Sequence, residues 1–309
     1  MVKMISLRDN VALRIFCILL IIKGYETTKS QFQILAENTT KIVERNLHVQ
    51  QCIQSAREKA YSVNEKYGDR HFAALWISMY SRFCMIDTNF LEQDRIENAF
   101  PFRLNKEIRC LKNTKRDPII RETFVKVRNI INGALDVFGM KRHVRLYRGM
   151  TEWKFNNQNY FVEEGFFSTS TDPTPAFRFA KGKYLLIVQN MNGVRIDKYV
   201  EERFMYQKEV LGKSGKMFQI KRKVTDYAEI KEILSDLKVN LVKVSGVDFP
   251  HTIVYISEVS VPSERQSVIE KQWPSMKSYC SVDHLSSASH AFKRAIVIQF
   301  ILVMLIFFW

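Results

Sequence analysis

The sequence predicts an α+β protein in which helices come first and strands follow. Before about residue 140, apolar residues recur at the three- and four-residue spacing of amphipathic helices. After it, short runs rich in β-branched and aromatic residues are separated by Gly, Asn, Pro and Asp. Because the two kinds of element are segregated along the chain, we expect a helical lobe followed by a β-rich core, and no sheet of β-α-β units.

Helical spacing is found in three segments of the first half, 49–67, 71–85 and 117–138. The last is the best delimited, since Asp117 is expected as its N-cap, Pro118 lies in its first turn and Gly139 follows its end. Its apolar residues fall on one stripe, which we expect in the core: Ile120, Phe124, Val127, Ile131, Leu135 and Phe138.

Short strands are expected throughout the second half. A single late helix interrupts them, with Asp226 as its N-cap and Glu229 three residues later. The expected strands are 144–147, 165–168, 184–189, 209–211, 217–220 and 252–259.

The two ends of the chain have the composition of targeting segments. Residues 1–24 place basic residues before an apolar run, which is the order of a secretory signal peptide; a first membrane helix or core helix is the alternative. At the other end, small residues at 286–289 and a short polar spacer precede the apolar run 295–309, which resembles a lipid-anchor attachment signal. A tail anchor or single span is the alternative there, with Lys293 and Arg294 snorkelling.

After the signal peptide at 1–24, the chain is expected to divide into a helical lobe at 25–140 and a β core at 141–280. A linker and the anchor signal follow at 281–309. Both interpretations of the C-terminal segment place the folded part outside the cytosol, on the cell surface or secreted. Asn38 begins an Asn-Thr-Thr glycosylation acceptor, which agrees with export.

Four cysteines remain once the signal is removed: Cys52, Cys84, Cys110 and Cys280. An even number in an exported chain predicts two disulfides, with three possible connectivities. We expect Cys52 to pair with Cys280, joining the two ends of the domain, and Cys84 to pair with Cys110. Their spacings fit no metal site.

The chain is basic, with a net charge of +15 from 47 basic and 32 acidic residues. The basic residues are scattered, so they form either an ordinary solvated surface or one that attracts anionic substrates and polyanions. No zinc-finger spacing, aromatic RNA-binding signature or basic helix accompanies the charge, and binding of nucleic acid is not expected.

Three short segments of the second half carry residues suited to chemistry. Arg148 ends an apolar strand, and Gly149 after it would let a ligand approach the backbone. Three hydroxyls, Ser168, Thr169 and Ser170, follow another apolar strand. Taken alone, the arginine is equally explained as an exposed strand end, and the hydroxyls as a turn that caps the next helix.

The third segment is Gln-Lys-Glu at 207–209. Side chains two apart in a strand share a face, so Gln207 and Glu209 are expected to point the same way and Lys208 the opposite way. Two polar residues facing solvent on an edge strand would have the same pattern.

Together, the order and spacing of these residues resemble the arginine, Ser-Thr-Ser and Glu-x-Glu signature of mono-ADP-ribosyltransferases of the ecto-enzyme and cholera-toxin-like type. Further segments are similar to family motifs, so the resemblance covers most of the predicted mature chain: ALWISMY at 74–80, LNKEIR at 104–109, YRG at 147–149, FSTS at 167–170, QKEVL at 207–211 and SYC at 278–280. The resemblance implies a core built as a split antiparallel or mixed β-sandwich, and NAD or NADP as a substrate that is cleaved rather than a cofactor.

The resemblance also implies roles for the matching residues. Glu209 would stabilise the positive charge that develops on the ribose when nicotinamide leaves. Arg148 would hold the dinucleotide phosphates, and Ser168 would orient Glu209 by a hydrogen bond. Phe177 or Phe179 would stack on the nicotinamide, with helix packing as the alternative for each ring.

Gln207 departs from the family pattern, because arginine-modifying members have glutamate there. Glutamine forms hydrogen bonds but acts as neither a base nor a counter-charge. We therefore expect NAD cleavage with transfer of ADP-ribose to a protein side chain, and the usual arginine acceptor is in question. An NAD glycohydrolase that uses water, or an inactive surface binding module with the same fold, are the alternatives. No metal is expected.

Overall fold

The computed structural model describes residues 29–47, 50–82, 100–111, 118–153, 159–239 and 248–260. The predicted signal, the C-terminal anchor signal and the segment SYC at 278–280 lie outside these ranges. Among the described helices, none is both long enough and apolar enough to span a bilayer.

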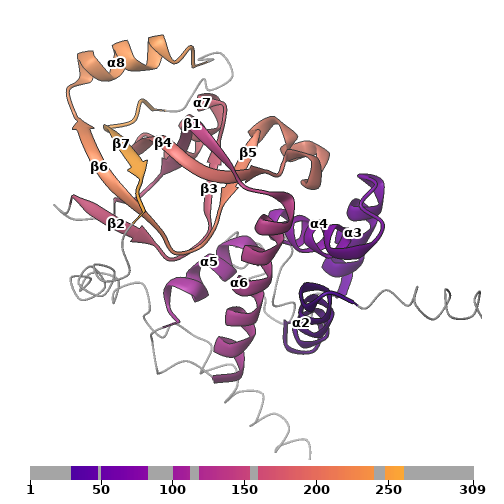
Figure 1. Ribbon diagram of the computed structural model, residues 1–309. Coiled ribbons are helices and arrows are strands. Elements are labelled where there is room, and N and C mark those ends of the chain that lie inside the picture. The colour runs from indigo at the N-terminus through magenta and orange to yellow at the C-terminus, as the bar shows by residue number, and fades with distance from the viewer. Residues whose placement is uncertain are drawn as a thin grey trace, which may run out of the picture.

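In the described part of the chain, five helices form the N-terminal lobe, which lies beside the β-rich core in Figure 1. The helix predicted at 117–138 is confirmed, and those predicted at 49–67 and 71–85 are present with shorter or shifted ends. In chain order the helices are α2 (Gln31–Leu47), α3 (Gln50–Ser62), α4 (Gly68–Ser81), α5 (Phe100–Arg109) and α6 (Pro118–Phe138).

Helix α2 was not predicted, because its middle contains two threonines, which have low helix propensity. The structure shows how the helix accommodates them. Thr39 Oγ1 donates to the carbonyl of Leu35 at 2.8 Å, and Thr40 Oγ1 donates to that of Ala36 at 2.9 Å. Both hydroxyls are thereby satisfied within the helix, one turn back along the chain.

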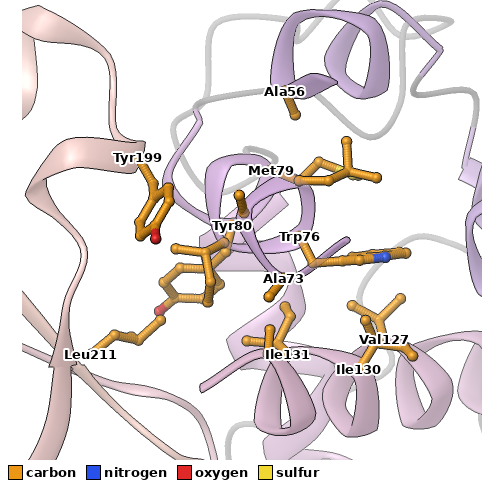
Figure 2. Packing of buried hydrophobic residues seen from close by; sticks show 14 of the residues in the cluster. Ala56, Ala73, Trp76, Met79, Tyr80, Val127, Ile130, Ile131, Tyr199 and Leu211 are labelled. Atoms are coloured by element: carbon orange, nitrogen blue, oxygen red, sulfur yellow. The ribbon is translucent and has the colours of Figure 1, made fainter. Parts of the chain in front are cut away.

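Helix α4 is the centre of the lobe and packs against α3 and α6. Trp76 of α4 points toward Val127 and Ile130 of α6 in Figure 2, and all three side chains are fully buried. Tyr199 and Leu211 enter the same cluster from the β-rich half. The lobe and the β core therefore share one hydrophobic core, which fixes α4 against the sheet.

Over the described residues, the β core is a seven-stranded mixed sheet in the order β1-β3-β5-β4-β7-β6-β2. Strands β4 and β7 are parallel, and the other pairs are antiparallel. The strands are β1 (Lys141–Met150), β2 (Tyr160–Glu163), β3 (Phe167–Ser170), β4 (Tyr184–Arg195), β5 (Glu209–Gly212), β6 (Lys216–Val224) and β7 (Thr252–Glu258).

The sheet folds back on itself at one end, because β1 pairs with both β3 and β4 and β5 pairs with the same two strands. Along β4, successive side chains pack into two different hydrophobic clusters. Leu186 and Val188 face the inside of the fold, whereas Leu185 and Ile187 face a cluster covered by α7 (Pro173–Ala180) and α8 (Tyr227–Asp236). The predicted α+β class, with helices first and a mixed β core second, is confirmed.

Local predictions were right in part. Asp226 caps α8 as predicted, since its side chain accepts from the Glu229 backbone N–H at 2.9 Å. The strand predicted at 165–168 is displaced to Phe167–Ser170, and β2 was not predicted. Cys52 and Cys110 are disulfide-bonded; Cys84 and Cys280 lie outside the described residues, so the pairing stays a prediction.

Candidate active site

A cavity of about 250 Å³ opens where the helical lobe meets the folded end of the sheet. Its lining comes from the end of α4, from α5 and from the 3-10 helix η3 (Glu202–Gln207), together with β1, β3, β5 and α7. All the site residues predicted from the sequence line it except Phe177: Arg148, Gly149, Ser168, Thr169, Ser170, Phe179, Gln207 and Glu209.

Glu209 and Ser168 are paired across two neighbouring strands. Ser168 lies opposite Leu211 and Ser170 lies opposite Glu209, so Ser168 and Glu209 are diagonal neighbours on one face. Ser168 Oγ donates a hydrogen bond of 2.5 Å to Glu209 Oε1. The serine thereby fixes the carboxylate, which is the role that the family resemblance implied.

The guanidinium of Arg148 is held in the same cavity by two contacts. Its Nη1 donates to the backbone carbonyl of Ser168 at 3.0 Å, and its Cζ lies 4.6 Å from the centre of the Phe167 ring. Both contacts involve β3, so the strand that orients the carboxylate also positions the cation. The two charged groups are therefore fixed relative to each other.

The environment of Glu209 disfavours its charged form. Burial raises the pKa of this carboxyl above its ordinary value, and the hydrogen bond from Ser168 and the charge of Arg148 offset the rise only in part. A carboxyl whose pKa is raised in a cavity, beside a fixed cation, is a frequent feature of active sites.

The structure corrects the reason for the common direction of Gln207 and Glu209. Gln207 ends the 3-10 helix η3 (Glu202–Gln207) and is not in a strand; β5 begins at Glu209. Between them Lys208 has a left-handed backbone (φ 46°), and its Nζ bonds the Asp172 carboxylate at 3.2 Å. The turn at Lys208, rather than strand alternation, brings both polar side chains to the cavity.

The backbone at Gln207 is also tied to the Ser-Thr-Ser segment. Ser170 Oγ donates to the Gln207 carbonyl at 2.6 Å and accepts from the backbone N–H of Asp172 at 2.9 Å. Thr169 Oγ1 donates to the carbonyl of Val210 at 2.9 Å. These two hydroxyls therefore hold the segment around Glu209 in place rather than pointing freely at a ligand.

Gly149 has a packing role that the sequence did not predict. A Cβ at this position would lie 2.0 Å from the carbonyl oxygen of Ala176 and 2.3 Å from the backbone nitrogen of Ala180. The glycine lets α7 lie directly on β1, and Asp172 caps that helix by accepting from Thr174 N at 2.9 Å. The close approach is made by a helix, although Gly149 also lines the cavity.

The two candidate aromatic rings of α7 separate into a core residue and a cavity residue. Phe177 is 0% exposed in the cluster beneath α7 and α8, so its predicted stacking on nicotinamide is wrong. Phe179 is 45% exposed and lines the cavity. Side chains two positions apart on a helix point to different sides, which is why only one of the two rings reaches the cavity.

The sequence assigned no site role to several residues of α4 and α5, or to the acid that contacts them. Asn105 of α5 donates to the Tyr80 hydroxyl at 3.1 Å and accepts from the Phe166 backbone N–H at 2.7 Å. Arg109, one turn further along α5, donates from Nε to Glu163 Oε1 at 2.7 Å. Tyr80, Asn105 and Arg109 lie in segments whose similarity to family motifs could have identified them; nothing in the sequence marked Glu163.

Among the described residues, no cluster of His, Cys, Asp and Glu side chains could hold a metal ion. The polar groups with which the described residues line the cavity are one carboxylate, two guanidiniums, two amides and several hydroxyls. Such a set can bind an anionic ligand and stabilise positive charge that develops close to Glu209.

No protein-family model and no curated protein matches the chain. Among solved structures, the ADP-ribosyltransferase HopU1 of Pseudomonas syringae pv. Tomato DC3000 matches with a TM-score of 0.51 and 14% identity, over 76% of this chain and 100% of its own. The eucaryotic mono-ADP-ribosyltransferase ART2.2 matches with a TM-score of 0.48 and 13% identity, over 74% and 87% of the two chains. Exoenzyme S from Pseudomonas aeruginosa, in its complex with human 14-3-3 protein beta and Carba-NAD, has a TM-score of 0.45 and 13% identity, over 79% and 98%. The likeness to HopU1 shows that this chain has the fold of an ADP-ribosyltransferase.

Proposed function

We propose that this protein is a mono-ADP-ribosyltransferase that cleaves the bond between nicotinamide and ribose in NAD or NADP and transfers ADP-ribose to a protein side chain. The observation that carries the proposal is the joint position of three groups. Glu209 accepts from Ser168 at 2.5 Å, and Arg148 is bonded to the carbonyl of that same serine at 3.0 Å, all within one cavity.

The reaction needs a fixed negative charge beside the ribose. When nicotinamide leaves, positive charge develops on the sugar as it does in glycoside hydrolysis. The carboxylate of Glu209 can stabilise this charge, because Ser168 holds it in place before the bond breaks. Since the dinucleotide is consumed, no bound cofactor is required.

Two cations are available for the phosphates of the dinucleotide. Arg148 of β1 and Arg109 of α5 both line the cavity. Burial lowers the pKa of Arg148, the charge of Glu163 opposes this, and the charge of Arg109 adds to it, so each guanidinium lies within the other's electrostatic reach. A bound diphosphate would relieve the repulsion between them. At the cavity mouth, Phe179 offers an exposed ring on which nicotinamide can stack.

Gln207 favours water, or a side chain other than arginine, as the acceptor. It lines the cavity next to Glu209 but carries no charge to attract a guanidinium and no basic oxygen to accept its proton. This supports NAD glycohydrolase activity as the second candidate function. The same fold without activity, as a surface binding module, remains the alternative from another class.

We also propose that the protein is exported and held on the outer face of the cell membrane by a C-terminal lipid anchor. The support is the basic-then-apolar order of residues 1–24 and the small residues, spacer and apolar run of residues 286–309. The acceptor protein would then be extracellular or on the cell surface. Release of the protein from intact cells by an enzyme that cleaves lipid anchors tests the proposal; retention in the membrane would indicate a spanning tail.

The activity is tested by incubating the full-length protein, expressed in eukaryotic cells, with NAD labelled on the adenylate, an arginine analogue and a mixture of proteins. Labelled protein or labelled arginine analogue would support transfer. Free ADP-ribose without either would support hydrolysis, and intact NAD would support the binding module. The same assay compares the wild type with Glu209→Gln. Glu202→Gln is the matched control, because Glu202 is exposed in the neighbouring η3 helix.

A further inference from the structure

Glu163 is a buried acid at the back of the candidate site. It lies at the end of β2 and is 4% exposed. Its Oε1 accepts from Arg109 Nε at 2.7 Å and from the backbone N–H of Gly165 at 2.9 Å. The acid itself does not line the cavity, whereas Arg109 does. Any effect of Glu163 on a ligand is therefore indirect, through its hydrogen bond to Arg109 and through its charge near Arg148.

The carboxyl is charged despite its burial. Burial acts to raise the pKa of Glu163, but the charge and hydrogen bond of Arg109, the charge of Arg148 and the N–H of Gly165 outweigh it, and the pKa is lowered. The charged form of this acid is thus favoured as a counter-charge to Arg109.

The arginine is fitted closely against the turn between β2 and β3. A Cβ at Gly165 would lie 2.8 Å from Asn105 Oδ1, 3.1 Å from Glu163 Oε1 and 3.2 Å from Arg109 Nη2. Only glycine leaves room for this arrangement. The same turn continues into Ser168, so the position of Arg109 is set by the segment that also orients Glu209.

An ordinary structural ion pair on the same helix provides the comparison. Glu107 of α5 is 3% exposed and pairs with Arg103 at 2.9 Å, within one helical turn. Arg103 does not line the cavity. The Arg109–Glu163 pair differs because it joins α5 to the sheet and its cation lies at the ligand cavity.

We propose that Glu163 is a positioning residue that acts through Arg109, holding the guanidinium so that it binds a phosphate of the dinucleotide. Glu163 then sets the affinity for the diphosphate part of the substrate and leaves the breaking of the nicotinamide–ribose bond to Glu209. The proposal rests on the proposed function, since it takes a nucleotide diphosphate as the ligand.

Binding of ADP-ribose to the full-length protein, measured by calorimetry, tests this without any turnover. Glu163→Gln is expected to weaken binding about tenfold, and Arg109→Gln at least as much, since hydrogen bonds to charged groups are involved. If Glu163 acts through Arg109, the double variant binds no more weakly than Arg109→Gln alone. Glu107→Gln, the matched control, is expected to bind as the wild type does, even if its melting temperature falls.

Kinetics supply the second measurement. Glu163→Gln is expected to raise KM for NAD about tenfold while kcat changes less than about twofold. Additive losses in the double variant, unchanged binding by Glu163→Gln, or equal losses in Glu163→Gln and Glu107→Gln would overturn the proposal. If the wild type binds ADP-ribose but releases no nicotinamide, the proposed reaction is contradicted, and the binding measurements still test the role of Glu163. If the folded wild type binds no ADP-ribose, both the proposed function and the role of Glu163 are contradicted.

Discussion

Ser168 and Glu209 are joined diagonally across β3 and β5 by a hydrogen bond of 2.5 Å, and the carbonyl of the same serine accepts from Arg148 at 3.0 Å. One residue thus organises both charged groups of the candidate site, the carboxylate through its side chain and the cation through its backbone. These two functions can be separated by mutation, because replacing serine by alanine removes the hydroxyl and leaves the carbonyl.

Ser168→Ala is expected to move the acid limb of the pH–rate profile to higher pH. The hydrogen bond from Ser168 lowers the pKa of Glu209 against the effect of burial, so its loss lets the pKa rise further. The measurement is kcat/KM for nicotinamide release as a function of pH, with Ser62→Ala, an exposed serine of α3, as the control. An acid limb that stays in place or moves to lower pH would show that the serine does not tune this carboxyl.

Glu209→Gln is expected to stabilise the protein at neutral pH. The pKa of Glu209 is raised in the folded state, so the stability that its protonated form provides is present below the unfolded pKa and lost as the pH rises through the folded pKa. Glutamine mimics the protonated form and avoids this loss. The variant should therefore melt at a higher temperature than the wild type at pH 7.5, and the difference should vanish near pH 4.

The control for this comparison is Glu202→Gln, which removes an exposed carboxylate of η3. Its melting temperature should follow that of the wild type at both pH values. A difference between Glu209→Gln and the wild type that is constant over pH would mean that ionisation of Glu209 does not oppose folding.

Gln207→Glu is expected to gain transfer of ADP-ribose to an arginine analogue. The new carboxylate would lie at the cavity beside Glu209, where it can attract a guanidinium and accept its proton. The measurement is the ratio of ADP-ribosylated analogue to free ADP-ribose, with Gln207→Asn as the control that adds no charge. The same ratio in the wild type and both variants would show that this position does not select the acceptor.

Phe179→Ala and Phe177→Ala are expected to separate binding from folding. Phe179 is 45% exposed at the cavity, so its loss should change stability by less than about 1 kcal/mol and weaken NAD binding about tenfold. Phe177 is fully buried, and its loss should cost about 3–5 kcal/mol. Denaturant unfolding and calorimetry measure the two effects. Equal NAD binding by Phe179→Ala and the wild type would show that the Phe179 ring does not contribute to NAD binding.

The residues at the centre of the site could be predicted from their combination along the chain, since each segment taken alone has an ordinary structural explanation. Arg148 ends an apolar strand, and the hydroxyl run at Ser168 follows another, so each was found without knowledge of the tertiary structure. Glu209, two residues after Gln207, is singled out because its order and spacing relative to Arg148 and Ser168 resemble the family signature. The fold class followed from the separation of helical and strand patterns along the chain.

The rest of the site depends on contacts between distant segments, which no local pattern reports. Glu163 became part of the site only because β2 pairs with β6 and places its end against α5, 54 residues earlier in the chain. Helix α5 is short and presents Asn105 and Arg109 at the four-residue spacing of one helical face, a pattern shared with many surface helices. The turn at Lys208 arises from a left-handed residue that is neither Gly nor Asn, the residues usually found there.

The central claim is that the Glu209 carboxylate promotes cleavage of the nicotinamide–ribose bond, and the initial rate of nicotinamide release from NAD tests it most directly. Wild-type protein and Glu202→Gln should release nicotinamide at the same rate, and Glu209→Gln should be slower on the order of a hundredfold or more while keeping its folded melting transition. Equal rates for Glu209→Gln and the wild type, or no release by the folded wild type, would contradict the account.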